Sequence, residues 1–269
     1  MKHSLFFLLL GSLFSTAWCQ KSNKPNYISF SAGIGFPVAS YAATDLRSSS
    51  SGFAKPGEYI SFAWSKLASE KIGYTVSLSG QRNPVNAKAM GEGFSKVLIN
   101  TGTLGTSIPG VPVTGAGSYY PNFNFKKSSW LLASLQGGLY GEFPLSASKN
   151  IVAIARLTAG AMYAQLPEQT GQSITDTSNA IIYQSKNSAF GFAYTLGTGI
   201  KYGLNKKTFV LLNFNYWASS ELTFKDEKVV ITLQKSGVAG GSINQMQYTN
   251  DASQAFKSIS ASLGIGIQL

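Results

Sequence analysis

Several segments of the chain alternate strictly between apolar residues and small or polar ones. From Ser258 to Leu269, isoleucine, alanine and leucine occupy every second position, and serine, glycine and glutamine lie between them. Because successive side chains of a β-strand point to opposite faces, this pattern predicts a strand with one apolar and one polar face. The polar face consists mainly of small residues, which suits a narrow interior. The pattern is typical of a transmembrane β-barrel strand, which needs about 9–11 residues to cross a bilayer.

Seven earlier segments show the same alternation. They begin at Tyr27, Tyr59, Ile72, Leu131, Ile151, Ala189 and Val210. The short connections between segments follow Leu67, Phe143 and Leu204, and the long ones follow Phe36, Gln81, Ala164 and Ala218. Short and long connections therefore alternate, as short periplasmic turns and long extracellular loops do in outer-membrane barrels. The sequence predicts an all-β fold, a transmembrane up-and-down antiparallel β-barrel of eight strands.

The long connections are predicted to be outer loops. The longest irregular stretch runs from Arg82 to Ser128, and another polar loop runs from Gln165 to Asn187. The last, Ser219 to Ser253, contains a strand-like patch at Val229–Leu233. This patch predicts either a hairpin above the membrane or additional barrel strands, which would make ten. The alternative fold is a soluble β-sandwich or lipocalin-like barrel, which would leave very few charges on its strand surfaces.

Composition supports a membrane protein that crosses with strands. Hydrophobic residues make up 44% of the chain and charged residues only 12%, whereas soluble domains usually carry about 25% charged residues. Apart from the first residues, no apolar run approaches the roughly 20 residues of a transmembrane helix. Lys2 and His3 precede the apolar run Leu5–Leu10 and a small-residue site near Ala17, which predicts a secretory signal peptide cleaved after Ala17 or Cys19. We therefore expect a signal peptide at 1–19 and a barrel domain at 20–269.

The alternating strands carry a resemblance to a known class of proteins. The segments Tyr27–Phe36, Phe190–Leu204 and Ser258–Leu269 resemble strands of small bacterial outer-membrane barrels of the OmpA transmembrane-domain and OmpX type. The resemblance covers nearly the whole mature chain and is specific to an architecture, with no single function attached. It implies that the protein lies in the bacterial outer membrane, among outer-membrane lipid and lipopolysaccharide. It also implies that the assembly machinery reads the C-terminal strand, although Leu269 stands where the family commonly has an aromatic residue.

The charge of the chain is strongly positive, with a formal net value of +11. On an exported protein such a surplus favours anionic lipid or polysaccharide as a partner over nucleic acid. Lys126 and Lys127 stand close to Trp130 near the predicted outer rim. Lysine and tryptophan are both favoured at membrane–water interfaces. We predict these three residues to be lipid-interface anchors; an overlapping interpretation is that Lys126 and Lys127 contact lipid phosphates.

Charged residues also fall on the predicted inward faces. Arg156 and Glu142 lie on strands joined by a short turn, and we predict that they pair inside the barrel with Lys201 or Gln136 nearby. Ionisable residues within a membrane protein are functional-site candidates by default. The interior of an eight-stranded barrel is, however, about wide enough for side chains to fill it. A plug of mutually satisfied polar groups is the favoured interpretation, and a conduction site is the alternative.

Candidate catalytic and metal-binding residues are scarce. His3 and Cys19 are the only histidine and cysteine, and both lie in or beside the predicted signal peptide. Their loss would exclude disulfides, thiolate metal sites and histidine bases from the mature chain. We predict no enzyme activity, no cofactor and no metal. The leading hypothesis is a structural or surface-interaction role through the outer loops. The alternative is a narrow porin-like channel for small solutes, favoured by the small inward residues, and a lipid-modifying enzyme ranks third.

Overall fold

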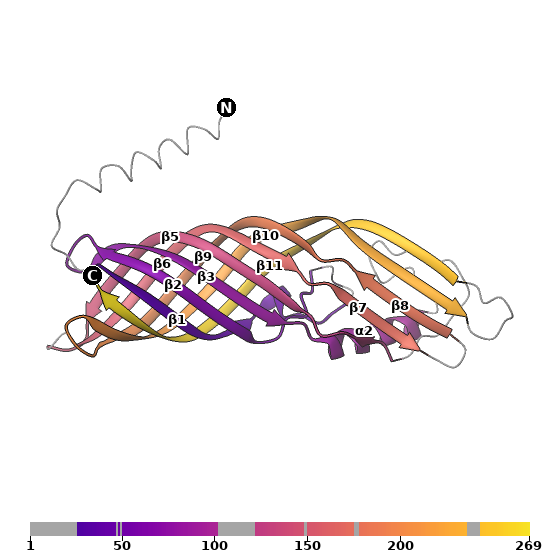
Figure 1. Cartoon of the computed structure of the whole chain (residues 1–269), viewed down its shortest axis with the longest axis horizontal. Coiled ribbons are helices and arrows are strands. Elements are labelled where there is room, and N and C mark those ends of the chain that lie inside the picture. Colours follow the sequence, from indigo (N-terminus) through magenta and orange to yellow (C-terminus); the bar gives the residue numbers. More distant parts are fainter. Residues whose placement is uncertain are drawn as a thin grey trace, which may run out of the picture.

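Eight strands close into a ring in which every strand pairs with an antiparallel neighbour on each side (Figure 1). The ring strands are β1 (Asn26–Pro37), β2 (Gly57–Leu67), β3 (Ile72–Pro84), β5 (Ser129–Pro144), β6 (Ile151–Leu166), β9 (Asn187–Gly203), β10 (Thr208–Lys235) and β11 (Ile243–Gln268). The structure is a computed structural model that describes residues 26–46, 48, 50–101, 122–147, 150–174, 178–235 and 243–269. The predicted signal peptide, 1–19, lies outside these residues.

The first and last strands of the chain complete the ring. β1 pairs with β11 without interruption, from Tyr27 opposite Gln268 to Pro37 opposite Ser258. β11 pairs on its other side with β10, beginning at Thr208 opposite Ile267. A closed ring satisfies the backbone hydrogen bonds that hydrocarbon cannot satisfy. The predicted eight-stranded up-and-down antiparallel barrel is confirmed.

The outside of the ring is a belt of large apolar side chains. Phe30 is 51% exposed, Leu135 57% and Leu263 70%, although all three lie within regular strands. Their neighbours along each strand point inward and are far less exposed, as the alternation predicted. A continuous exposed apolar surface of this kind is the lipid-facing surface of a membrane barrel. The architecture is that of a small outer-membrane barrel.

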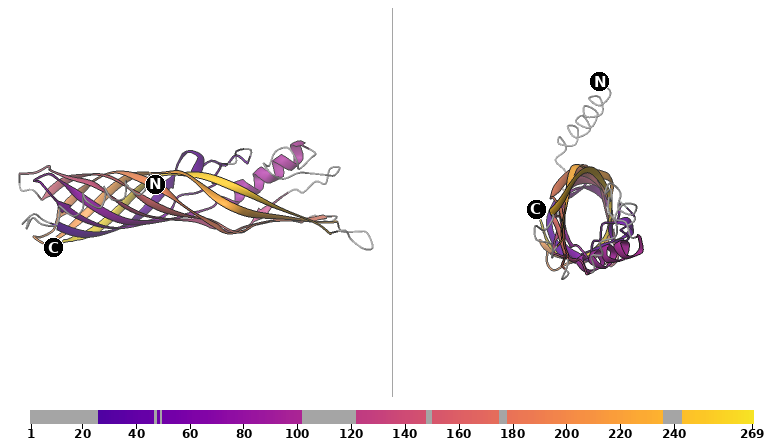
Figure 2. Two further views of the ribbon diagram at one scale, coloured as in Figure 1. Left: turned by 90° about the horizontal axis from the view of Figure 1, so that it is seen from above. Right: turned by 90° about the vertical axis from the view of Figure 1, so that its right-hand side faces the viewer.

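The two ends of the barrel differ. Short turns after Leu67, Pro144 and Gly203 lie at one end, where β1 also begins and β11 ends (Figures 1 and 2). The long connections lie at the opposite end, here called the outer end. Among the described residues, no helix is long and apolar enough to cross a membrane.

β10 and β11 continue far beyond the ring as a two-stranded arm (Figure 2, left). Their pairing extends to Gln234 opposite Ile243. A hairpin of β7 (Gln169–Ile174) and β8 (Ser178–Gln184) joins this arm, because β8 pairs with β10 from Val229 onward. The predicted polar loop at Gln165–Asn187 does connect two ring strands at the outer end, but it contains this hairpin, which was not predicted from the sequence. The patch Val229–Leu233 lies in the hairpin that β10 and β11 form above the ring. This was one of the two predicted interpretations of the patch, which adds no strand to the ring.

Two irregularities in β10 mark where the ring gives way to the arm. The register against β11 shifts between Ala218 and Glu221, and again between Phe224 and Glu227. β10 makes its last pair with β9 at Ser219 and then turns toward β8. Because each bulge inserts a residue into one strand, it changes which positions face inward. The bulges thus redirect the strand and reset its inward face.

A helix, α2 (Ala87–Thr101), stands beside the arm at the outer end (Figure 2). The prediction that Arg82–Ser128 is irregular is therefore wrong in part, since β3 continues to Pro84 and α2 follows. The side chain of Asn86 caps the helix by accepting a hydrogen bond from the Ala89 amide at 3.2 Å. The two-residue strand β4 (Asn124–Phe125) pairs with β7 and packs against α2. Gly91 and Gly93 lower the helix propensity of this segment, and for this reason the sequence did not predict a helix here.

Gly91 is required for the close packing of α2. A Cβ at Gly91 would lie 2.1 Å from the carbonyl oxygen of Phe123. In an open helix Gly→Ala would stabilise by about 1 kcal/mol. We instead expect Gly91→Ala to destabilise the docking of α2 by roughly 1–3 kcal/mol, because a backbone carbonyl must move. Limited proteolysis at α2 should become faster, while the barrel keeps its heat-dependent shift in gel mobility.

Gly93→Ala is the matched control on the same helix. The nearest atom to its added Cβ would be Leu46 Cδ1 at 2.8 Å, the end of a flexible side chain. This variant should resist proteolysis as well as the unmodified protein. Equal resistance of both variants would contradict the close packing at Gly91.

Candidate functional site

An ion pair and an apolar cluster close the barrel near its short-turn end. Lys201 and Glu142 form an ion pair across β6, and Glu142 also accepts a hydrogen bond from Tyr140 Oη at 2.7 Å. Lys201 Nζ lies 4.8 Å from the ring centre of Tyr27 and 5.3 Å from that of Phe209. The cation is therefore held between a carboxylate and two aromatic faces. The buried cluster around it consists of Tyr27, Leu67, Tyr140, Val152, Ile154, Phe209 and Leu211.

Arg156 does not pair with Glu142, contrary to the prediction. Its Nη2 atom donates to Asn213 Oδ1 at 2.8 Å and to Asn215 Oδ1 at 3.2 Å. The reason lies in the register, which places Arg156 opposite Gly197 of β9, the strand between β6 and β10. A Cβ at Gly197 would lie 3.3 Å from Arg156 Nε, so the absent side chain lets the guanidinium reach β10. Lys201 takes the place next to Glu142.

The middle of the lumen is a network of hydrogen-bonded polar side chains. Asn213 and Asn215, which hold Arg156, donate in turn to Ser31 Oγ and Ser260 Oγ, both at 3.2 Å. Asn213 is 1% exposed and Ser31 3%. Other inward side chains pair in the same way: Ser65 with Thr75, Ser79 with Ser134, and Gln136 with Thr158 and Thr195. These hydrogen bonds fill the middle of the lumen with side chains, several of which are almost fully buried.

Four aromatic side chains seal the outer end of the lumen, and we call them the aromatic plug: Tyr41, Trp130, Phe224 and Phe256. The ring of Phe256 lies 4.9 Å from that of Tyr41 and 5.3 Å from that of Trp130, in edge-to-face arrangements. Each of the four is at most 5% exposed. Edge-to-face pairs add about 0.5–1.5 kcal/mol to the burial of such rings. The plug separates the lumen from the outer side.

The prediction that Trp130 is a lipid-interface anchor is wrong. Its indole Nε1 donates to the Gly52 carbonyl at 2.8 Å inside the barrel mouth. The strand alternation explains this, because Leu131 faces outward and its neighbour must face inward. Lys126 and Lys127 are exposed on the loop that precedes β5.

The loop between β1 and β2 supplies the rest of the plug. It begins with the short 3-10 helix η2 (Ala39–Tyr41), and Tyr41 Oη donates to Asn83 Oδ1 at 3.1 Å. Ala39 and Phe53 adopt positive φ values of 55° and 50°, which are uncommon for residues with side chains. Such strain persists only where the surroundings hold it in place. Here the two positive-φ residues turn the loop back into the barrel mouth.

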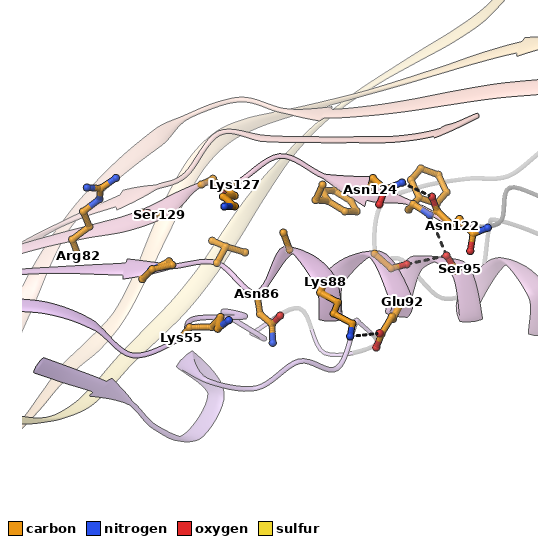
Figure 3. Close-up of a pocket in the computed structure, with 17 residues that line it drawn as sticks. Lys55, Arg82, Asn86, Lys88, Glu92, Ser95, Asn122, Asn124, Lys127 and Ser129 are labelled. Atoms are coloured by element: carbon orange, nitrogen blue, oxygen red, sulfur yellow. Dashed lines mark hydrogen bonds and ion pairs between the residues drawn. The ribbon is translucent and has the colours of Figure 1, made fainter. Parts of the chain in front are cut away.

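The outer platform comprises α2, β4, the β7–β8 hairpin and the arm, and it carries a basic groove. The groove has a volume of about 1020 Å³ and runs from the outer ends of β3 and β5 to α2. Figure 3 shows Arg82 at its barrel end, with Lys127 and Lys55 farther along and Lys88 beside Glu92 on the helix. Arg82 occupies the outward face of β3, in phase with Leu78 of the apolar belt. The groove therefore begins at the lipid-facing wall.

Basic residues outnumber acidic ones in the lining of this groove, and Glu58 of β2 lies opposite Arg82 in the sheet. Glu92, the single acidic residue among the described lining residues, is 3.9 Å from Lys88. No ion pair joins Lys55, Arg82 or Lys127 to an acidic side chain in the part of the chain that the structure describes. Such a concave surface of one sign attracts anions. Only Lys127 of these three was singled out from the sequence, since the others come together through the fold.

A second cavity, of about 490 Å³, lies within the platform above the aromatic plug. Its wall is largely apolar and includes Phe94 of α2, Ile182 of β8 and Val229 of β10. The buried carboxyl group of Glu227 also lines it, and this burial raises the pKa of Glu227, while a hydrogen bond with Gln184 lowers it in part. Among the described residues, no cluster of three or more histidine, cysteine or acidic side chains suits a metal ion.

Comparison with solved structures finds similar barrels along most of the chain. Ail, the attachment invasion locus protein of Yersinia pestis, is 10% identical and matches 92% of this chain and 100% of its own, with a TM-score of 0.40. Neisserial surface protein A is 9% identical over 91% of this chain and 97% of its own, with a TM-score of 0.37. A major outer membrane protein from Thermus thermophilus is 12% identical over 91% and 99%, with a TM-score of 0.40. No protein-family model and no curated protein matches the sequence.

The ion pair in the lumen generates a stability prediction. We expect Glu142→Gln to lower the free energy of unfolding by about 3 kcal/mol, because Lys201 would remain buried without its counter-charge. The double variant Glu142→Gln, Lys201→Met should recover most of that loss. Urea titrations of the refolded barrel in lipid vesicles provide the measurement.

The exposed residue Glu58 supplies the control, since Glu58→Gln should change the free energy of unfolding by less than about 0.5 kcal/mol. An equal loss in the single and double variants would mean that the charge pairing is not what stabilises this layer.

Proposed function

We propose that this protein is an outer-membrane barrel with a structural and surface-interaction role, carried by its outer platform. The observation that supports this most directly is the aromatic plug over a hydrogen-bonded lumen. A sealed barrel is a rigid scaffold, and binding residues are often carried by the segments that such scaffolds hold in place. Here the platform, with its groove and cavity, is the part of the protein that lies at the outer end and is available to a binding partner.

The alternative, a narrow channel, has less support. Many predicted inward residues are small, but Ser31 and Ser260 accept hydrogen bonds from asparagine side chains of β10. Ser31, Asn213 and Ser260 are each at most 3% exposed. A path for solutes would require several layers to separate together, including the ion pair and the aromatic plug. An enzymatic role also has little support, because the described residues contain no histidine and no cysteine to act as base or thiol nucleophile.

The partner we propose for the basic groove is the phosphorylated headgroup of lipopolysaccharide. Arg82 lies in phase with the lipid-facing residues of β3, so one end of the groove meets the outer leaflet. Lys55 and Lys127 continue the positive surface toward the outside. Basic side chains near a charged membrane surface contribute about 1 kcal/mol each. The expected reading of the C-terminal strand by the assembly machinery stays a prediction.

We expect no steady conductance when the refolded protein is inserted into a planar lipid bilayer. Removing two rings of the plug, as in Tyr41→Ala with Phe256→Ala, should still leave the polar network and the ion pair closed. Folding is checked by the heat-dependent shift in gel mobility. Steady channels formed by the unmodified protein, altered in Arg156→Ala, would overturn the sealed-barrel proposal in favour of a pore.

Neutralising the groove should weaken binding of lipopolysaccharide. Three changes, Lys55→Gln, Arg82→Gln and Lys127→Gln, remove about 3 kcal/mol of attraction, which corresponds to an affinity loss of roughly 100-fold. The measurement is surface plasmon resonance with the refolded protein in uncharged detergent, repeated with dephosphorylated lipopolysaccharide.

A matched control places the same charge loss at the short-turn end. Lys71, Lys206 and Lys207 are exposed there, and their replacement by glutamine should leave the affinity nearly unchanged. Equal losses in the two triple variants would show that net charge, and not the groove, governs binding.

A further inference from the structure

The cavity inside the platform differs from the groove in charge as well as in shape. The groove is lined by four basic residues, whereas no lysine or arginine among the described residues lines the cavity. Its ionisable side chains include two carboxylates, Glu227 and Asp251. On a chain with a formal charge of +11, a cavity with acidic and no basic lining stands out. A volume of about 490 Å³ is within the range of roughly 300–1,000 Å³ that small-molecule sites occupy.

The position of Glu227 is set by the second bulge of β10. Leu222 and Phe224 point inward, so regular alternation would bring Asp226 to the next inward position. The extra residue at the bulge, together with a φ of 54° at Asp226, instead turns Glu227 inward. Asp226 is exposed, and its amide donates a hydrogen bond of 3.1 Å to Asp251 Oδ1. Bulges commonly re-aim a side chain beside a functional site.

One buried polar atom on the cavity wall lacks a hydrogen-bond donor, and a buried carboxylate lies on the same wall. Glu227 is 7% exposed, and none of the ion pairs among the described residues includes it. Gln169 is 4% exposed, and its Oε1 has no hydrogen-bond partner among the described residues. A buried acceptor without a donor costs about 1–3 kcal/mol. Glu227 has a hydrogen bond with Gln184, so the acceptor without a donor is Gln169 Oε1. This free acceptor, on the same wall as a carboxylate that has no ion-pair partner among the described residues, complements a ligand that brings a charged donor.

We infer that this cavity binds a small, largely apolar organic ammonium compound, with Glu227 as its charge partner. The apolar body of the ligand would contact Phe94, Ile182 and Val229, and Gln169 would accept a hydrogen bond from the ligand. Aromatic side chains in the wall also favour a cation or a flat ring. The proposal is independent of the groove, because the two hollows share only Phe125 among their described lining residues and have opposite charge.

Three fluorescent probes of equal size test the inference. They are 2-naphthylmethylamine, 2-naphthylmethanol and 2-naphthoate, which are cationic, neutral and anionic at neutral pH. Each is titrated against the full refolded protein in nanodiscs of uncharged lipid, with empty nanodiscs as the blank. We expect saturable binding of the amine, about tenfold tighter than that of the alcohol, because a hydrogen bond to a charged group is worth more than a neutral one. The carboxylate should bind least.

Variants assign the binding to the cavity and to Glu227. Glu227→Gln keeps the shape of the side chain and should remove the preference for the amine over the alcohol. Glu221→Gln is the control, because Glu221 is exposed on the same strand and does not line the cavity. Ala252→Trp should fill the cavity and abolish binding of all three probes. The gel-mobility shift and an unchanged resistance to proteolysis at α2 show that the barrel and the platform of each variant are folded.

Several results would overturn the inference. Binding of the carboxylate as tight as that of the amine would exclude charge recognition by Glu227. A preference for the amine that survives Glu227→Gln would do the same. Binding that persists in Ala252→Trp would place the probes elsewhere, and the absence of saturable binding would exclude the site. Because the neutralised groove variant should bind the amine normally, failure here is distinguishable from failure of the lipopolysaccharide proposal.

Discussion

The structure depends on one constraint: no backbone hydrogen-bonding group can remain unpaired in hydrocarbon. β1 and β11 satisfy it by pairing along their shared length, from Tyr27 and Gln268 to Pro37 and Ser258. Closure of the sheet removes its edges, and it is the reason that strands far apart in the sequence must be neighbours. The apolar belt follows, since every second residue of each ring strand then faces lipid.

Closing the ring with eight strands leaves a narrow interior, and the inward residues are small for that reason. At Gly264, an added Cβ would lie 2.2 Å from Ser31 Oγ. The charged side chains Lys201 and Arg156 of the interior each have a nearby partner. Lys201 forms an ion pair with Glu142, and Arg156 donates hydrogen bonds to two asparagine side chains. Buried polar groups are tolerated where their partners are supplied in this way. Packing therefore accounts for the interior, and the functional surface lies elsewhere.

The outer platform is released from this constraint, because it stands in water. Two bulges turn β10 away from the ring, and the arm, the β7–β8 hairpin, α2 and the β1–β2 loop then line a cavity. The result places a basic groove at the lipid-facing wall and an acidic, apolar cavity within the platform. If both proposals hold, the opposite charges of the two hollows let one small platform discriminate between anionic lipid and cationic small molecules.

The sequence by itself determined the ring. Strict alternation predicted the eight strands, the lipid-facing residues and the inward position of Glu142, Arg156 and Lys201. It could do so because every second side chain of a ring strand faces lipid. The alternation also held a signal that Trp130, next to the outward Leu131, faces inward, but the prediction of a lipid-interface anchor missed it. Only the tertiary structure decided which inward charges meet, since reach across the lumen depends on register and on the missing side chain at Gly197. It alone decided the platform as well: α2 is stabilised by packing on the Phe123 backbone, and Glu227 faces the cavity because of a bulge that periodicity does not reveal.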